Sequence, residues 1–295
     1  MIEISHLVKK YGQSFAVNDI SFSVNEGEVL GFLGPNGAGK TTTMNILTGY
    51  LSATGGTAKI AGIDILENPM EAKKHIGFLP EHPPLYPDMT VKEYLNFVYN
   101  LKKCTLNRKA HLDEICEVIR IEDVYKRPIS HLSKGYRQRV GIAQALIGNP
   151  DVLIFDEPTV GLDPKQIIEI RNLIRTLGKD HTVILSTHIL QEVQAVCDRI
   201  LIINKGKLVA DERTENINRA VEASRRFRLK VAAPQKEVLT FLRSRSDISY
   251  VEALSERDGD AYTFLVESTP GIDIRKSLFY ALAERHWPMV GLEAV

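Results

Sequence analysis

The segment Gly34–Thr41 has the residue types and the spacing that phosphate binding requires. It reads Gly-Pro-Asn-Gly-Ala-Gly-Lys-Thr and fits the pattern G-x-x-x-x-G-K-[ST]. Glycines let the backbone curl so that successive N–H groups face inward, and a following helix adds the positive end of its dipole. Lys40 would reach the β- and γ-phosphates, and the Thr41 hydroxyl would ligate Mg²⁺. The alternative is a glycine-rich turn that binds nothing, and a strand before the loop with a helix after it argues against that.

Two further polar segments follow apolar runs and could act on a bound phosphate. The run Val152–Phe155 ends in Asp156 and Glu157, and the run Thr182–Ser186 is soon followed by His188. Buried parallel strands end at the carboxyl edge of a sheet, where ligands bind in open α/β folds. Asp156 would hold Mg²⁺ through water, Glu157 would polarise the attacking water as general base, and His188 would donate to the γ-phosphate. Alone, the acidic pair could equally cap a strand, and the histidine could be an ordinary surface residue; the phosphate loop favours the catalytic interpretation.

The elements that must position these residues appear in the hydrophobic pattern. The run Val29–Leu33 predicts a buried strand leading into the loop, and Thr42–Leu47 predicts a helix that ends at Gly49. Further strands are predicted over Ile2–His6, Ala16–Val24, Thr57–Ile60, His75–Pro80, Arg199–Ile203 and Lys207–Ala210. Apolar residues at helical spacing predict a mostly helical region from Thr90 to about Val124, whose apolar stripes we interpret as core.

Length and composition describe an ordinary globular protein without a strong charge bias. The chain has 295 residues, 44% hydrophobic and 25% charged, and its 37 Lys and Arg balance its 37 Asp and Glu. Nucleic-acid binders usually show a basic excess, so no nucleic-acid partner is expected. No apolar stretch approaches the length of a membrane span, and Met1–Ile4 begins a strand-like alternation rather than a signal peptide. The three widely spaced cysteines argue against a metal or disulfide framework and fit a reducing cytosol.

The residues after Ala210 predict a second, small domain. Asp211–Arg226 is charged and predicts a helical linker. The segments that follow are a strand at Phe227–Val231, a helix at Val238–Leu242, strands at Ile248–Leu254 and Ala261–Glu267 around the turn Asp258-Gly259, a helix at Ile274–Leu282 and a strand at Trp287–Leu292. This βαββαβ order would suit a ferredoxin-like α+β domain. We interpret it as a dimerisation or regulatory domain; a stabilising cap on the main domain is the alternative.

A further segment, Leu132–Arg139, reads Leu-Ser-Lys-Gly-Tyr-Arg-Gln-Arg and completes a set of motifs. Together with Gly34–Thr41, Ile154–Glu157, Gly161–Asp163 and His188, in this order, it resembles the ATP-binding cassette of ABC transporters. The resemblance looks closest to the ATPase subunits that drive ABC-2-type permeases, including the gliding-motility-associated group. The number and order of the motifs make it specific, whereas a single motif would not.

The resemblance covers about residues 1–215 and implies an ABC ATP-binding domain there, so residues 216–295 are left for the accessory α+β domain predicted above. The first would be an α/β P-loop NTPase cassette with an antiparallel β subdomain, a RecA-like core and a helical subdomain. The implied nucleotide-binding residues are Tyr11, which would stack on adenine, the Walker A residues Gly34, Pro35, Asn36, Gly37, Ala38, Gly39, Lys40, Thr41 and Thr42, and, from a second copy of the domain, Ser133, Gly135 and Asp163. The implied catalytic residues are Glu157, the switch histidine His188 and the Q-loop residue Glu81, and the implied metal ligands are Thr41, Asp156 and Glu81.

The signature segment also has a physical logic of its own. Ser133 precedes an apolar-spaced helix, and a serine at a helix N-terminus offers a hydroxyl, free N–H groups and the positive end of a dipole. One chain could not bring this site and the phosphate loop onto one phosphate if they lie on opposite lobes, but two chains arranged head-to-tail could. An ordinary capped helix is the alternative. Glu81 stands where the family usually has glutamine, and Lys134 and Tyr136 replace the usual glycine and glutamine.

The predicted function is that of an ATPase engine for a membrane exporter, using ATP and Mg²⁺. A separate multi-span permease would supply the pathway, and the chain would lie in the cytoplasm at the inner face of the membrane. A soluble ABC ATPase of DNA repair or translation is the second hypothesis, although such proteins generally carry two cassettes or a long coiled-coil insert. A small-molecule kinase or GTPase is a third, but the sequence lacks an N-K-x-D guanine motif, since Asn204–Lys207 does not satisfy it.

Overall fold

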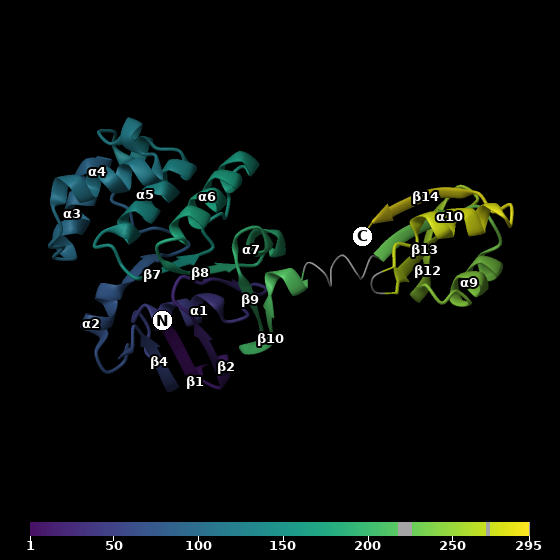
Figure 1. Cartoon of the computed structure of the whole chain (residues 1–295), viewed down its shortest axis with the longest axis horizontal. Coiled ribbons are helices and arrows are strands. Elements are labelled where there is room, and N and C mark those ends of the chain that lie inside the picture. Colours follow the sequence, from purple (N-terminus) through teal and green to yellow (C-terminus); the bar gives the residue numbers. More distant parts are fainter. Residues whose placement is uncertain (218–225, 270–271, 295) are drawn as a thin grey trace. The chain divides into compact units, whose positions relative to one another are not determined.

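The computed structural model describes residues 1–217, 226–269 and 272–294. The chain folds as two compact units, Met1–Thr214 and Glu215–Val295 (Figure 1). The predicted linker helix over Asp211–Arg226 is wrong at its start, because residues 211–213 belong to the strand β10 (Lys207–Arg213). The central part of that prediction, residues 218–225, lies outside the described residues.

A six-stranded sheet in the order β10-β9-β3-β8-β7-β6 forms the centre of the first unit. Its other strands are β3 (Val29–Leu33), β6 (Ile76–Leu79), β7 (Val152–Asp156), β8 (Thr182–Thr187) and β9 (Arg199–Asn204). These five run parallel, and β10 pairs antiparallel at one edge. Every residue of β3, β7 and β8 is buried, as expected of parallel strands covered on both faces. The sequence predicted these runs because such strands are continuously apolar.

A second, antiparallel sheet in the order β2-β1-β4-β5 packs against the same core. Its strands are β1 (Ile2–Tyr11), β2 (Ser14–Val24), β4 (Gly55–Ile60) and β5 (Ile63–Asp64). Its inward-facing side chains share one core with β3 and with the helix α1 (Lys40–Leu47). Phe22 and Phe32 join the two sheets with ring centroids 5.7 Å apart. The helix α1, which directly follows the glycine-rich loop, therefore packs in a core shared by both sheets.

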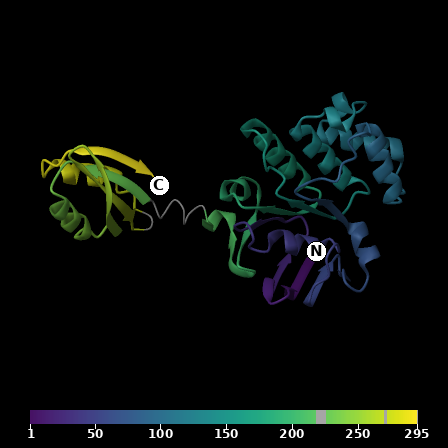
Figure 2. The same cartoon turned by 180° about the vertical axis from the view of Figure 1, so that it is seen from behind.

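Three of the remaining helices of the first unit form a group. The helices α3 (Val91–Leu101), α4 (Arg108–Ile119) and α5 (Lys134–Leu146) gather at one side of the unit, away from β1 and β2, in both views (Figures 1 and 2). The others are α2 (Pro69–Ala72), α6 (Pro164–Leu177) and α7 (Leu190–Val196), with short 3₁₀ turns at Lys73–His75, Glu122–Val124 and Ile129–His131. The predicted helical region from Thr90 to Val124 is two helices, because Asn107 caps the start of α4 with its side chain.

The second unit has the predicted βαββαβ order. Its elements are β11 (Arg226–Val231), α9 (Gln235–Arg243), β12 (Ile248–Asp258), β13 (Ala261–Ser268), α10 (Arg275–Ala283) and β14 (Met289–Ala294). The strands form one antiparallel sheet in the order β12-β13-β11-β14. Apolar residues of both helices, among them Val238, Leu242, Leu278 and Leu282, share a core with the strands, so this unit has a core of its own.

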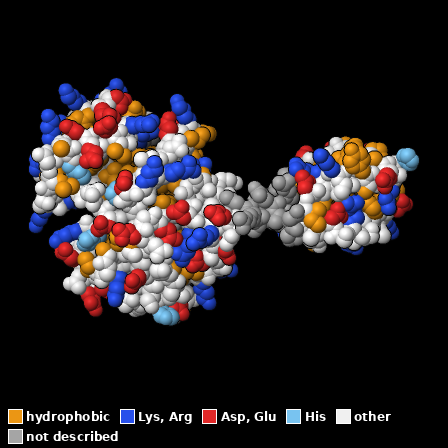
Figure 3. Space-filling view, viewed as in Figure 1, with side chains coloured by type: hydrophobic (Ala, Val, Ile, Leu, Met, Phe, Trp, Pro, Cys, Tyr) orange, Lys and Arg blue, Asp and Glu red, His pale blue; other side chains and the backbone are white. Residues whose placement is uncertain are grey.

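The surface carries both signs of charge. On the face shown in Figure 3, acidic and basic side chains of the first unit are interspersed, in keeping with the equal totals of 37. Within the described ranges, none of the helices combines the length and the apolar character needed to cross a membrane.

Candidate nucleotide site

The phosphate loop predicted from the sequence joins β3 to α1, and its backbone requires glycine at one position above all. Gly39 has φ 109°, and a Cβ there would lie 2.3 Å from the carbonyl oxygen of Ala16. Gly37 is also left-handed, with φ 78°, but has open space around it. The loop lines a cavity of about 380 Å³. Its lining residues are Ala16, Asn36, Gly37, Gly39, Lys40, Thr41, Thr42, Glu81, Glu157, Val160 and His188.

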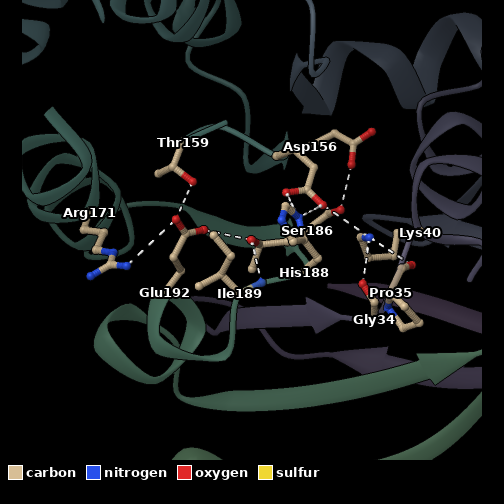
Figure 4. A network of polar contacts seen from close by, with 12 residues as sticks. Gly34, Pro35, Lys40, Asp156, Thr159, Arg171, Ser186, His188, Ile189 and Glu192 are labelled. Carbon is tan, nitrogen blue, oxygen red and sulfur yellow. Dashed lines mark hydrogen bonds and ion pairs between the residues drawn. The ribbon is translucent and has the colours of Figure 1, made fainter. Parts of the chain in front are cut away.

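Three predicted site residues from three separate segments meet in this cavity (Figure 4). Lys40 Nζ lies 3.2 Å from Glu157 Oε1, and only 6% of the lysine side chain and 7% of the glutamate side chain are exposed. Lys40 Nζ also donates to the carbonyl oxygens of Gly34, at 2.8 Å, and Pro35, at 3.3 Å. On the other side of the carboxylate, His188 Nδ1 lies 3.0 Å from Glu157 Oε2 and 3.1 Å from Oε1. The catalytic carboxylate predicted from the sequence thus lies between a buried ammonium group and an imidazole.

Asp156, at the end of β7, is 1% exposed and has one unused oxygen. Its Oδ1 accepts from Ser186 Oγ at 2.7 Å, whereas Oδ2 is buried and has no hydrogen-bond partner among the described residues. Burial raises the pKa of Asp156, and hydrogen bonds from Ser186 and Thr41 oppose that rise. A buried oxygen without a partner costs free energy, and a cation would remove that cost. Asp156 and the Thr41 hydroxyl therefore fit a hard cation such as Mg²⁺.

No group of three or more His, Cys, Asp or Glu side chains in the described part of the chain is placed to hold a metal ion. Mg²⁺ is commonly held by one or two carboxylates together with phosphate oxygens and water, so such a group is not required. Glu81 is exposed and lines the same cavity as Thr41. Its charge contributes to the raised pKa of Asp156 as the smallest of the named causes.

The signature residues lie outside this cavity. Ser133 is the N-cap of α5 and accepts from the Tyr136 N–H at 3.4 Å, as predicted. Asp163 caps α6 through a reciprocal pair of hydrogen bonds with Gln166. A Cβ at Gly135 would lie 2.7 Å from the Gln166 side chain, so the starts of α5 and α6 touch. Of the described residues that line the phosphate-loop cavity, none comes from α5.

Tyr11 lies at the end of β1 and is 53% exposed, with Lys9 Nζ 5.3 Å from the centre of its ring. An exposed aromatic ring at the end of a strand can stack on a flat ligand. The predicted adenine contact stays a prediction, since Tyr11 is not among the residues that line the cavity.

Comparison with known proteins decides the family. Residues 17–160 match the family model described as "ABC transporter". The chain is 38% identical over 213 residues to the bacitracin transport ATP-binding protein BcrA of Bacillus licheniformis. The aligned region covers 72% of this chain and 69% of that protein. The chain belongs to the ATP-binding subunits of ABC transporters. It is an ABC-type ATPase, as the order of its motifs predicted.

Two further likenesses support this assignment. The chain is 36% identical over 214 residues to the Nod factor export ATP-binding protein I of Ralstonia nicotianae, covering 71% of this chain and 66% of that protein. Its structure is similar to the dimeric post-hydrolysis state of the ATP-binding cassette MJ0796 bound to ADP and phosphate. That likeness has a TM-score of 0.66 and 26% identity, and covers 72% of this chain and 99% of that one. The ABC fold predicted for the chain is confirmed.

Beside the predicted catalytic residues Glu157 and His188, this ABC ATPase also has a buried polar cluster that the sequence did not indicate (Figure 4). Glu192 on α7 is 1% exposed and accepts from Thr159 Oγ1 at 2.6 Å and from Thr187 Oγ1 at 2.8 Å. Arg171 Nη2 of α6 lies 3.8 Å from the same carboxylate. From the sequence, a glutamate in a short helix is expected at the surface. Only the two threonines, each close in sequence to a predicted catalytic residue, could have indicated this cluster.

Proposed function

We propose that this chain is the ATP-hydrolysing subunit of an ABC-2-type exporter, and that it works through a head-to-tail dimer closed by ATP. The observation that carries the proposal is the meeting of Lys40, Glu157 and His188 in one cavity, with the signature serine Ser133 outside it. The names of two relatives, one of bacitracin transport and one of Nod factor export, support a role in transport, and the second supports transport outward. The dimeric cassette MJ0796 supports the dimer.

Nucleotide binding would begin at the Walker A loop and would change the partner of Lys40. The inward-facing N–H groups of the loop and the ammonium group of Lys40 attract phosphate oxygens. Phosphate would replace Glu157 as the counter-charge of Lys40, which now lies 3.2 Å from the carboxylate. Glu157 would then keep His188 as its neighbour and gain the freedom to accept a proton.

Hydrolysis would use Glu157 as the general base. Its carboxylate would accept a proton from the attacking water, while His188, 3.0 Å from Oε2, would hold that carboxylate in place and donate toward the γ-phosphate. Mg²⁺, held by Asp156 and the Thr41 hydroxyl, would neutralise charge that develops on the phosphate oxygens. Glu81 would lie near this cation and add a carboxylate where the family usually has an amide.

Two observations support the proposed dimer: Ser133 caps a helix whose N-terminus offers a second anion site, and it does not line the phosphate-loop cavity of its own chain. In a head-to-tail pair, each ATP would lie between the Walker A loop of one chain and the signature of the other. Asp163 would lie at the same seam. ATP would hold the two chains together and hydrolysis would separate them. A separate multi-span permease, seated near the Glu81 loop and α3, would convert this cycle into transport at the inner face of the membrane.

A mixing experiment tests the shared site. Lys40→Ala inactivates the loop, and Ser133→Asp keeps a good N-cap but places a negative charge where phosphate would bind. Each variant alone should be inactive, and a one-to-one mixture should recover about a quarter of the parental ATPase rate, because half of the dimers retain one intact site of two. Ser133→Asn, which keeps the cap without the charge, is the matched control. A mixture that stays inactive would show that the site does not combine two chains.

The permease is tested separately. Membranes from cells that express a tagged Glu157→Gln chain are extracted in detergent with ATP and Mg²⁺, and the tagged chain is purified. We expect a multi-span protein to be recovered in stoichiometric amount, and Lys40→Ala to recover less. Recovery of the tagged chain without any integral membrane protein would contradict the exporter assignment.

A further inference from the structure

The buried carboxylate of Glu192 joins the two loops that carry the proposed catalytic residues. Thr159 lies two residues after Glu157, and its hydroxyl donates to Glu192 Oε1 at 2.6 Å. Thr187 lies immediately before His188, and its hydroxyl donates to Glu192 Oε2 at 2.8 Å. One carboxylate therefore receives a hydrogen bond from each loop.

All three members of this cluster are withdrawn from solvent. Glu192 is 1% exposed, Thr187 is fully buried and Thr159 is 4% exposed. Hydrogen bonds to a charged group in such surroundings are stronger than those between neutral groups at the surface. Arg171 Nη2, at 3.8 Å from Glu192 Oε1, supplies a positive charge nearby. The cluster is thus well satisfied, and removing one member leaves a buried oxygen without its partner.

Thr187 is also tied to the backbone beside His188, one of the proposed catalytic residues. The Thr187 hydroxyl accepts from the N–H of Ile189 at 3.2 Å, and so holds the residues on both sides of His188. The carbonyl oxygen of Thr187 accepts from the N–H of Gly34 at 3.3 Å, which connects the cluster to the phosphate loop. Movement of Thr187 would therefore reach both the histidine and the loop.

Glu157 needs such support because its backbone is in a costly conformation. Its φ is 49°, in the left-handed region that a residue with a side chain seldom adopts, and such a conformation persists only where the surroundings hold it. Its N–H donates to the carbonyl oxygen of Ser186 at 2.9 Å, and its carbonyl oxygen accepts from the N–H of Val160 at 3.3 Å. The bond from Thr159 to Glu192 fixes the next part of the same loop.

We infer that Glu192 is a positioning residue for ATP hydrolysis, which sets the distance between Glu157 and His188 through Thr159 and Thr187. This inference rests on the roles proposed above for Glu157 and His188. Glu192 does not line the phosphate-loop cavity, and the ion pair of Lys40 is with Glu157 and not with Glu192. Glu192 therefore acts on the rate of hydrolysis and not on nucleotide affinity. Its effect passes through the two hydroxyl groups, which can be removed one at a time.

The test replaces each threonine by the isosteric valine and by serine, which keeps the hydroxyl. Thr159→Val and Thr187→Val should each lower kcat about ten-fold, because a displacement of well under an ångström at the reacting groups has effects of this size or more. The affinity for a fluorescent ATP analogue should change less than about two-fold, since Lys40 keeps its contacts. The two serine variants should return most of the lost kcat.

Matched controls separate positioning from general damage. Glu28→Gln removes another glutamate–arginine pair, with Arg199 at 3.2 Å, at the opposite end of β3 from the phosphate loop. It should leave kcat unchanged. Glu192→Gln should resemble the valine variants, and if it fails to fold the threonine variants still decide the question. Thermal unfolding should show that each valine variant stays folded at the assay temperature, although it is less stable than its serine counterpart because a buried Glu192 oxygen loses its hydrogen bond.

Coupling to His188 gives the decisive result. If Thr159 acts by placing Glu157 against the histidine, Thr159→Val should cost much less in a His188→Ala background than in the parent. Three results would each overturn the inference: equal costs in both backgrounds, a kcat of Thr159→Val no lower than that of Glu28→Gln, or a parallel loss of nucleotide affinity. Glu157→Gln is measured in the same assay. Full hydrolysis by Glu157→Gln would refute the proposed base. An inactive Glu157→Gln together with a fully active Thr159→Val would refute only the role of Glu192.

Discussion

The buried pair of Lys40 and Glu157 makes a strong prediction about stability that does not depend on catalysis. The two side chains are 6% and 7% exposed and their charged atoms are 3.2 Å apart. Removing one member of a buried ion pair leaves the other without its counter-charge, which costs about 3 to 5 kcal/mol. Because Glu157 borders a cavity of about 380 Å³ that water can enter, and because His188 remains beside it, we expect Lys40→Ala to cost about 3 kcal/mol, the lower end of that range.

A double variant shows that the pair itself is responsible. Lys40→Ala with Glu157→Gln removes both charges, so most of the loss should return and the free energy of unfolding should fall only about 1 kcal/mol below that of the parent. Glu157→Gln alone should cost less than Lys40→Ala, since the ammonium group keeps the carbonyl oxygens of Gly34 and Pro35.

The assay is urea unfolding with EDTA and without nucleotide, because bound ligand would stabilise the native state and mask the difference. Far-UV circular dichroism follows both units. The single tryptophan, Trp287, lies in the second unit, so its fluorescence is an internal control that should not respond to Lys40→Ala. A first-unit transition in Lys40→Ala within about 0.5 kcal/mol of the parent, or a double variant as unstable as Lys40→Ala alone, would refute the reasoning.

Three further predictions follow from the same site. Burial raises the pKa of Asp156 in the folded state. Without metal, the free energy of unfolding should therefore fall as the pH rises from the ordinary pKa of an aspartate through the raised pKa of Asp156. Asp156→Asn should not show this fall when its unfolding is measured between pH 4 and pH 7, and a parental pH dependence in the variant would contradict the prediction. Gly39→Ala should lower stability by roughly 1 to 3 kcal/mol in thermal unfolding, and clearly more than Gly37→Ala, because only the former brings a Cβ against Ala16. Glu157→Gln should lower ATP hydrolysis roughly 10²-fold or more and give a stable dimer with ATP in size-exclusion chromatography, whereas a monomer with parental turnover would exclude the assigned base.

Much of the fold was predictable because its central strands are simple. The run Val29–Leu33 was predicted with its observed bounds, since a strand covered on both faces is apolar throughout. Strands at the surface were less visible: β1 continues past His6 to Tyr11, but His6 has φ 50° and the register with β2 shifts nearby, so the alternation of apolar and polar residues breaks. Local irregularity of this kind hides a strand from pattern analysis.

The chemical groups of the site were predictable for another reason. Phosphate binding imposes glycine, lysine and threonine at fixed spacing, and the acidic pair and histidine follow apolar runs. The supporting residues obey no such spacing. Ser186, Thr159 and Glu192 come from different segments, and each is an ordinary residue until the fold brings their oxygen atoms within 2.6 to 2.8 Å of a partner. Their roles depend on tertiary contacts, which a single sequence does not record.

The site contains two buried clusters, Lys40 with Glu157 and Glu192 with Thr159 and Thr187, to which we assign different roles. In the proposed mechanism, phosphate would replace Glu157 as the counter-charge of Lys40, so this contact would change when a nucleotide binds. The contacts of Glu192 with Thr159 and Thr187 involve no group that lines the cavity, so they can stay the same throughout the cycle. If ATP releases Glu157 from Lys40, Glu157 must still be correctly placed when the water attacks. The hydrogen bonds that place it must therefore not depend on ATP. Glu157 and Thr159 are two residues apart in the sequence but have different partners, so we expect binding and positioning to respond to different substitutions.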